Sequence, residues 1–145
     1  MLRYPVMVTK EGKNLLAEFP DCPGCQTFAR PGTEIASESR DALVGWLEAT
    51  LQEGDLPPKP SKKAGAVPKG AEVLWVEVPA KLGVKLEMRW ARAAAGLTQA
   101  ELARRAGVSQ PAIAQIEHPD SNPTIDTLQK VADALGVKLS VSLVR

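Results

Sequence analysis

The chain has 145 residues, 44% hydrophobic and 24% charged, which suits one domain or two small ones and excludes a large multidomain enzyme. Lys and Arg (18) nearly balance Asp and Glu (17), and aromatic residues are only 4%, so neither a global basic field nor a base-stacking platform is indicated. Because no apolar run could span a bilayer and no basic-then-apolar leader opens the chain, we expect a cytoplasmic protein with no membrane partner.

A connector rich in Pro and Lys divides the chain at residues 54–70. Its four prolines remove backbone donors, and Lys59, Lys62 and Lys63 crowd together, which is typical of a solvated linker. Residues 1–55 carry five basic and nine acidic side chains, a net charge of −4, whereas residues 73–145 carry nine basic and seven acidic ones, a net charge of +2. We therefore expect two domains, residues 1–78 with the connector inside it and residues 79–145.

The first domain opens with two strands, at residues 3–9 and 14–19, which flank the turn sequence Glu11-Gly12-Lys13 and predict a hairpin. A third short strand is expected at residues 25–28. From Pro31 to Gly54 apolar residues recur at helical spacing, and residues 72–78 (EVLWVEV) indicate one more strand. The predicted order is β-β-β-α-β, which makes the fold class α+β. The helix stripe comprises Ile35, Ala42, Leu43, Trp46, Leu47 and Leu51.

The second domain is predicted to be a bundle of four helices. A helix over residues 79–95 precedes the capping box Thr98-Gln99-Ala100-Glu101, which opens a second helix that ends at Gly107. Ser109 is expected to cap a third helix with Ile113 and Ile116 inside, and Thr124 to cap a fourth. The expected inner face of that fourth helix comprises Ile125, Leu128, Val131, Ala132 and Leu135.

A strand is expected after the bundle, because Val137, Leu139, Val141 and Leu143 alternate with polar residues. An isolated strand is not stable, so this segment needs a partner. We interpret it as a dimer contact in which two copies pair their strands. Pairing within the chain, with residues 72–78, is the alternative.

Residues 97–117, LTQAELARRAGVSQPAIAQIE, resemble the helix-turn-helix of the Cro/C1 (XRE) repressor family. The resemblance implies that the third helix of this domain enters the DNA major groove and that Gln99 holds a phosphate at a helix N-terminus. A glutamine can pair with adenine, and a small apolar group can touch a thymine methyl. The positions that would face base edges are Ser109, Gln110, Pro111, Ala114 and Gln115.

The same resemblance implies an ion bridge between Arg92 and Glu117, which would fix the orientation of the first and third helices. Pro111 and Ala112 remove hydrogen-bonding side chains from the recognition face, so base readout rests on few residues. The alternative for each polar residue is the solvated face of a helical bundle.

Three segments of the first domain resemble the HicB antitoxin family: YPVMVTKEGKNLLAEFPDCPGC at 4–25, SRDALVGWLEATLQEG at 39–54 and LPPKPS at 56–61. The resemblance implies a truncated RNase H-like β-β-β-α-β fold followed by an all-α helix-turn-helix domain. One departure is residues 29–32, Ala-Arg-Pro-Gly, where that family more often has a Gly-acidic-Thr helix cap.

That resemblance also implies a partner, a small basic HicA-type ribonuclease toxin that the antitoxin occludes, and repression of its own operon by a dimer bound to operator DNA. The acidic first domain suits a basic partner, although an acidic surface also serves solubility. Candidate toxin contacts are Glu18, Asp21 and Glu48, whereas Trp46 lies on the apolar stripe and is assigned to the core. A homodimer is expected, and a higher oligomer with the toxin stays open.

The sequence does not favour a catalytic role. Cys22-Pro23-Gly24-Cys25 could form a redox pair or half of a zinc site, but Pro-Gly at its centre favours a type II turn and no second cysteine pair exists. His118 lacks a recognisable nucleophile and orienting acid, and the first strand lacks the carboxylate that RNase H chemistry needs. We expect no catalytic residue, metal or cofactor.

Two rival functions remain open. The first is a stand-alone dimeric transcriptional repressor whose amino-terminal domain senses a small ligand. The second is an enzyme that uses Cys22 or the acidic residues, which would require metal or redox dependence.

Overall fold

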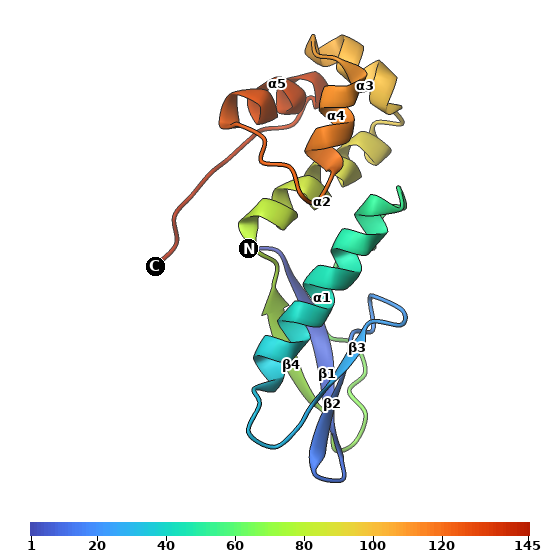
Figure 1. Cartoon of the computed structure of the whole chain (residues 1–145), viewed down its shortest axis with the longest axis vertical. Coiled ribbons are helices and arrows are strands. Elements are labelled where there is room, and N and C mark those ends of the chain that lie inside the picture. Colours follow the sequence, from blue (N-terminus) through green and yellow to red (C-terminus); the bar gives the residue numbers. More distant parts are fainter. The chain divides into compact units, whose positions relative to one another are not determined.

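The computed structural model describes all 145 residues, and the chain divides into two compact units, Met1–Gly83 and Val84–Arg145 (Figure 1). The division falls inside α2 (Ala80–Ala94), a few residues beyond the expected boundary after residue 78. The backbone N–H of Val78 donates to the carbonyl of Leu2 (2.9 Å), which keeps the chain on the first unit's sheet up to the start of α2.

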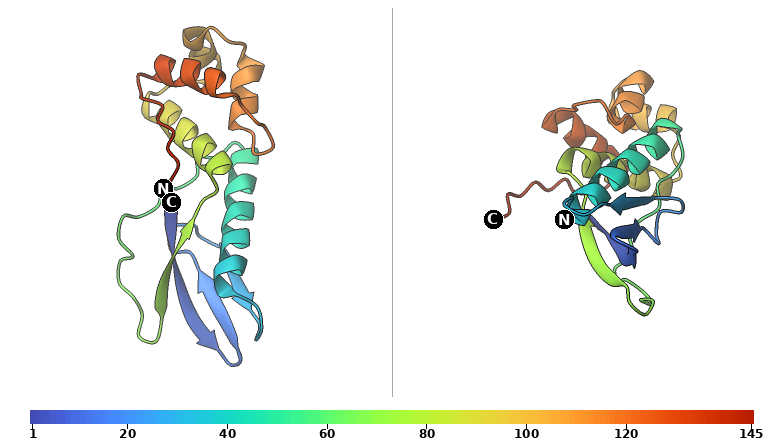
Figure 2. Two further views of the ribbon diagram at one scale, coloured as in Figure 1. Left: turned by 90° about the vertical axis from the view of Figure 1, so that its left-hand side faces the viewer. Right: turned by 60° about the horizontal axis from the view of Figure 1, so that its bottom comes forward.

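The first unit has the β-β-β-α-β order: β1 (Arg3–Glu11), β2 (Asn14–Glu18), β3 (Gln26–Ala29), α1 (Ile35–Gln52) and β4 (Glu72–Glu77). The sheet order is β3-β2-β1-β4, and all three neighbouring pairs are antiparallel. After α1 the linker runs back along the sheet, so β4 enters from the far end and pairs antiparallel with β1 (Figure 2). The fold class is therefore α+β.

The core of this unit lies between α1 and the one sheet face that α1 covers (Figure 2). Side chains alternate across the strands, so every second residue of β1 points toward the helix. The buried set is mostly aliphatic, as the composition predicts. It comprises Tyr4, Val6, Val8, Ala17, Leu43, Leu47, Leu51 and Val76.

The start of the linker is anchored, although the sequence predicts a solvated segment. The Tyr4 hydroxyl donates to the Pro58 carbonyl (2.6 Å), and Pro57 is fully buried. The Asp21 carboxylate accepts bonds from the backbone N–H (2.7 Å) and the hydroxyl (2.6 Å) of Ser61. Because prolines keep the chain extended and leave its carbonyls free, the sheet can hold this stretch. From Ser61 to Gly70 every residue except the half-buried Ala64 is exposed, as expected of a solvated linker.

Helix α1 begins at Ile35 rather than at Pro31. The Thr33 hydroxyl donates to the Arg30 carbonyl (2.7 Å), which closes a turn ahead of the helix, and Glu34 at the N-cap makes no side-chain cap bond. Trp46 is half-buried on the helix stripe.

The second unit contains most of α2 with α3 (Gln99–Ala106), α4 (Gln110–Glu117) and α5 (Ile125–Leu135). The hydroxyls of Thr98, Ser109 and Thr124 each accept a backbone N–H at the start of a helix, as the sequence predicts. One aliphatic cluster joins the helices. It comprises Met88, Leu97, Leu102, Ala103, Ile113, Ile116, Leu128, Val131 and Ala132.

One expected core residue, Ile125, is 61% exposed, because the buried stripe of α5 begins one turn later, at Leu128. None of the helices is both long enough and apolar enough to cross a membrane.

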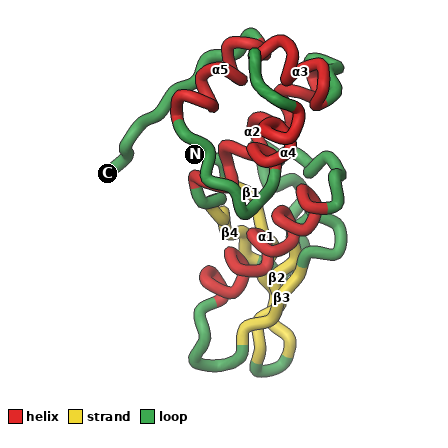
Figure 3. The backbone as a smooth tube through the Cα atoms, turned by 45° about the horizontal axis from the view of Figure 1, so that its top comes forward, coloured by secondary structure: helices red, strands yellow, loops and turns green.

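The strand expected over residues 137–144 is not formed. Figure 3 shows the segment after α5 as a loop, and β4 pairs only with β1, so the alternative of pairing with residues 72–78 is absent as well. The physical reason is that the second unit contains no strand whose edge could pair with it. Leu139 instead packs partly against the helical core, while Val137, Val141 and Leu143 are 45%, 68% and 99% exposed.

Candidate nucleic-acid interface

Helices α3 and α4 are joined by a tight turn. Gly107 ends α3 with φ at +69°, a left-handed conformation that glycine adopts without a Cβ penalty. The backbone N–H of Val108 then donates to the Ala103 carbonyl (3.0 Å), and Ser109 starts α4 at once. Leu102 and Ala103 of α3 and Ile113 and Ile116 of α4 are buried together, so both helices are held by their inner faces.

The positions that would face base edges lie on the outer side of α4, where Gln110, Pro111, Ala114 and Gln115 are all exposed. Ser109 is also exposed, but its hydroxyl accepts the backbone N–H of Ala112 (3.2 Å), so it begins the helix and keeps only its own O–H for a ligand. These five residues are brought to one solvent face, and their contact with DNA stays a prediction.

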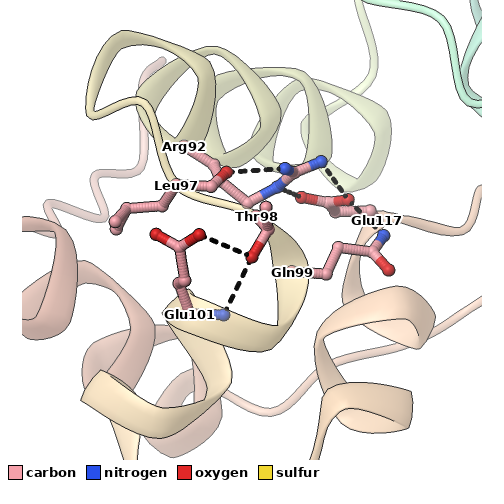
Figure 4. Close-up of polar contacts among 6 residues, drawn as sticks. All are labelled: Arg92, Leu97, Thr98, Gln99, Glu101 and Glu117. Carbon is pink, nitrogen blue, oxygen red and sulfur yellow. Dashed lines mark hydrogen bonds and ion pairs between the residues drawn. The ribbon is translucent and has the colours of Figure 1, made fainter.

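Arg92 of α2 and Glu117 of α4 are in contact through two parallel hydrogen bonds (Figure 4). Arg92 Nε lies 2.5 Å from Glu117 Oε1, and Arg92 Nη2 lies 3.1 Å from Oε2. The remaining guanidinium nitrogen, Nη1, donates to the Leu97 carbonyl at 2.9 Å. Since the two side chains are only 12% and 9% exposed, this pair is a part-buried link between α2, the α2–α3 loop and α4.

Gln99 takes part in the same network. Its side-chain Nε2 donates to Glu117 Oε2 at 2.9 Å, and the residue is half-buried at the start of α3 (Figure 4). One amide N–H is thus used inside the protein, and the phosphate contact expected of Gln99 would need the other. No local sequence pattern links residues 99 and 117, so the contact could not be predicted.

Lys85 is a further buried polar residue of this unit, which the motifs of the sequence did not single out. The residue is fully buried, and its ammonium nitrogen donates to the carbonyls of His118, Pro119 and Ser121, each at 2.6 Å. The signal was available, because Lys85 lies one turn from both Leu82 and Met88 on the apolar stripe of α2.

The three candidate toxin contacts are not brought together. Glu18 is exposed on β2, on the sheet face away from α1, since its neighbour Ala17 is buried on the helix side. Glu48 lies in α1, half-buried, on the opposite layer. Asp21 uses both carboxylate oxygens to hold Ser61.

Cys22 and Cys25 form a corner. The backbone N–H of Cys25 donates to the Cys22 carbonyl (2.9 Å), and Gly24 has φ at +84°, which is the geometry of a type II turn. Both thiols are free and buried, and the Cys25 thiol lies 3.6 Å from the Ala42 carbonyl. Burial raises the pKa of Cys22 to about 12, with Cys25 and Asp21 adding to the effect, and raises the pKa of Cys25 to about 11. Both thiols are therefore protonated, and poor nucleophiles, at neutral pH.

Comparison with known proteins gives matches along the chain. A helix-turn-helix family model matches residues 88–141. The chain is 32% identical over 144 residues to Antitoxin HicB 1 of Photorhabdus laumondii, covering 98% of this chain and 87% of that protein. It is 29% identical to Antitoxin HicB of Escherichia coli K12, covering 99% of this chain and all of that protein. A solved HicA3 and HicB3 toxin-antitoxin complex aligns with a TM-score of 0.47 at 22% identity, covering 54% of this chain and 99% of that one.

Removing one partner of the Arg92–Glu117 pair should destabilise the second unit strongly. We expect Arg92→Met to lower the free energy of unfolding by about 3 kcal/mol, because it leaves a buried carboxylate without its counter-ion. The double variant Arg92→Met/Glu117→Leu should recover most of that loss, since no charge is then left unpaired. Urea unfolding followed by circular dichroism measures both. A double variant no more stable than Arg92→Met would contradict the charge explanation.

The cysteine corner should make folding stability fall at alkaline pH. Below about pH 9, the ordinary thiol pKa, folded and unfolded chains bind the same thiol protons. Above it the unfolded chain releases them first, so stability decreases as the pH rises toward 11 and 12. We expect the Cys22→Ala/Cys25→Ala variant to lose less of its free energy of unfolding between pH 9 and 11, as measured by urea titrations.

Burial should also protect the two cysteines from alkylation. In the native protein, iodoacetamide at pH 8 should react with both thiols far more slowly than after unfolding. Native rates equal to the unfolded rates would contradict the burial argument.

Proposed function

The chain belongs to the HicB antitoxin family, and on that premise we propose that its first unit binds and neutralises a HicA-type, mRNA-cleaving toxin while its second unit represses its own operon. The observation that carries the proposal is that one chain joins a sheet-and-helix unit to a helix-turn-helix whose recognition face is solvent-exposed. The near full-length similarity to two HicB antitoxins supports it.

Operator binding would use the outer side of α4. Gln110 and Gln115 can each offer a donor and an acceptor to adenine, and Pro111 and Ala114 can contact thymine methyl groups. The Ser109 O–H and the second amide N–H of Gln99 would add a base-edge and a phosphate contact. Since so few side chains can hydrogen-bond, the operator should be read partly through methyl contacts.

Toxin binding would use the acidic character of the first unit. Glu18 is the best placed of the three candidates because its side chain is exposed on the sheet face that α1 does not cover, between its strand neighbours Met7 and Gln26. Glu48 would contact the toxin only if the partner also reaches the α1 layer. Asp21 would contribute indirectly, by holding the linker at Ser61.

A homodimer is part of the proposal, because repressors of this kind bind two half-sites about one helical turn, or ~34 Å, apart. Residues 137–144 supply exposed apolar side chains in an extended segment that has no partner strand in its own chain. Two such segments from two copies could pair through their backbones. Neither proposed role needs catalysis by this chain, and both place it in the cytoplasm, where mRNA and operator DNA are found.

The two activities should be separable by mutation. We expect Glu18→Lys to weaken binding to the toxin encoded beside this gene without changing operator affinity, because the charge reversal lies in the first unit. Gln110→Ala/Gln115→Ala should weaken operator binding without changing toxin binding. Affinity co-purification, RNA cleavage by the released toxin and gel shifts on promoter DNA measure these effects. A chain that purifies alone yet shifts its promoter would favour the stand-alone repressor with a ligand-sensing domain.

Disrupting the tail should give a monomer. Val141→Lys/Leu143→Lys places charges at two exposed tail positions and leaves Leu139 in the helical core, so folding should be unchanged. Sedimentation velocity should then show a monomer, with a loss of operator affinity that reflects single half-site binding. Deletion of residues 137–145 should also give a monomer, although it removes the packing of Leu139 against the helical core as well. A dimer that persists in both variants would exclude the tail as the dimer contact.

A further inference from the structure

We propose that Lys85 is a positioning residue for DNA recognition: its ammonium group holds the segment that follows α4 against α2 and thereby sets the angle at which α4 presents its outer face. The inference rests on the proposed operator binding. It assigns to a buried lysine of α2 an effect on a surface formed by α4.

The ammonium group of Lys85 is buried and donates to three backbone carbonyls. Burying an isolated ammonium is very unfavourable, and the residue has no exposed surface. Three carbonyls compensate, from His118, Pro119 and Ser121, each 2.6 Å from the nitrogen. An ammonium has three N–H donors and can therefore serve several carbonyls at once. A neutral side chain of the same length would leave these three carbonyls, of which the contact to Pro119 is buried and the other two part-buried, without this charged donor.

The three carbonyls belong to the turn that ends α4. His118 is the C-cap of the helix, and its carbonyl also accepts the backbone N–H (3.2 Å) and the hydroxyl (3.0 Å) of Ser121. Carbonyls at a helix C-terminus carry partial negative charge, so a cation there is favourable. Lys85 therefore places a cation beside the C-terminus of α4, bonded to the C-cap residue and to the turn that follows the helix.

Lys85 and Arg92 lie seven residues apart on α2, which is two helical turns and about 10 Å along one face. Arg92 binds Glu117, the last residue of α4, and Lys85 binds the turn directly after it. The buried Ile113 and Ile116 hold the inner face of α4, and Arg92 fixes its last residue. Lys85 adds a second directional anchor on the same face of α2, which limits how far α4 can rotate on its aliphatic contacts. For this reason we assign to Lys85 control of orientation as well as stability.

The test compares Lys85→Met with Lys81→Met, an exposed lysine on the first turn of the same helix. Each full-length variant is measured at a temperature where circular dichroism shows it fully folded. We expect Lys85→Met to bind operator DNA about tenfold more weakly, the size of one lost base contact. Binding to non-specific DNA and the salt dependence should stay unchanged, because no phosphate contact is lost. Lys81→Met should match the wild type.

The possible outcomes separate the explanations. A folded Lys85→Met that keeps wild-type operator affinity would show a role in stability alone and overturn the proposal. A salt slope reduced by about one would show that Lys85 contacts a phosphate directly, which also overturns it.

A second variant covers the case in which Lys85→Met fails to fold. Lys85→Gln keeps two N–H donors and should give an intermediate operator affinity with unchanged non-specific binding. Failure of both variants to fold would contradict a positioning role. If the wild-type chain does not bind its promoter at all, the proposed DNA binding fails first, which is evident before any variant is compared, and this inference falls with it.

Discussion

The second unit depends on one buried carboxylate. Glu117 is almost fully removed from solvent, so its charge must be compensated within the protein, and two other helices supply that compensation. Arg92 comes from α2 and Gln99 from α3, while Arg92 also ties down the Leu97 carbonyl of the intervening loop. Aliphatic side chains can pack in many relative orientations, whereas an arginine–carboxylate pair with two hydrogen bonds requires particular distances and angles. The network therefore specifies how the small helices cross, and Lys85 extends it beyond the end of α4.

The first unit is organised by a different constraint, a four-stranded sheet with a helix on only one face. The long linker must return along the sheet before β4 can pair with β1, and Tyr4 and Asp21 hold the start of that return. The arrangement places Glu18 and Glu48 on opposite layers. A partner that recognises the acidic character of this unit must therefore choose one layer or reach around an edge.

Each unit has its own core, and this organisation suits the two proposed roles, toxin binding and operator binding. The Cys22–Cys25 corner, whose spacing alone would also allow a redox pair or half of a zinc site, is a buried turn whose thiols have raised pKa values. Its backbone hydrogen bonds shape the connection from β2 to β3, beside the residue that anchors the linker. The Cys-Pro-Gly-Cys sequence is thus accounted for by the turn that connects β2 to β3.

The sequence by itself determined the order of the strands and helices, the three hydroxyl caps at Thr98, Ser109 and Thr124, and the turn at Gly107, because these signals act within a few residues. Family resemblance added the outward set on α4 and the Arg92–Glu117 pair. Only the tertiary structure decided that Lys85 is buried, that Gln99 binds Glu117, that Asp21 holds Ser61 and that residues 137–144 form no strand within the chain. Gln99 and Glu117 lie 18 residues apart, and Asp21 and Ser61 lie 40 residues apart, while residues 137–144 have no partner strand in their own chain. No local periodicity or cap encodes which distant group a side chain will meet.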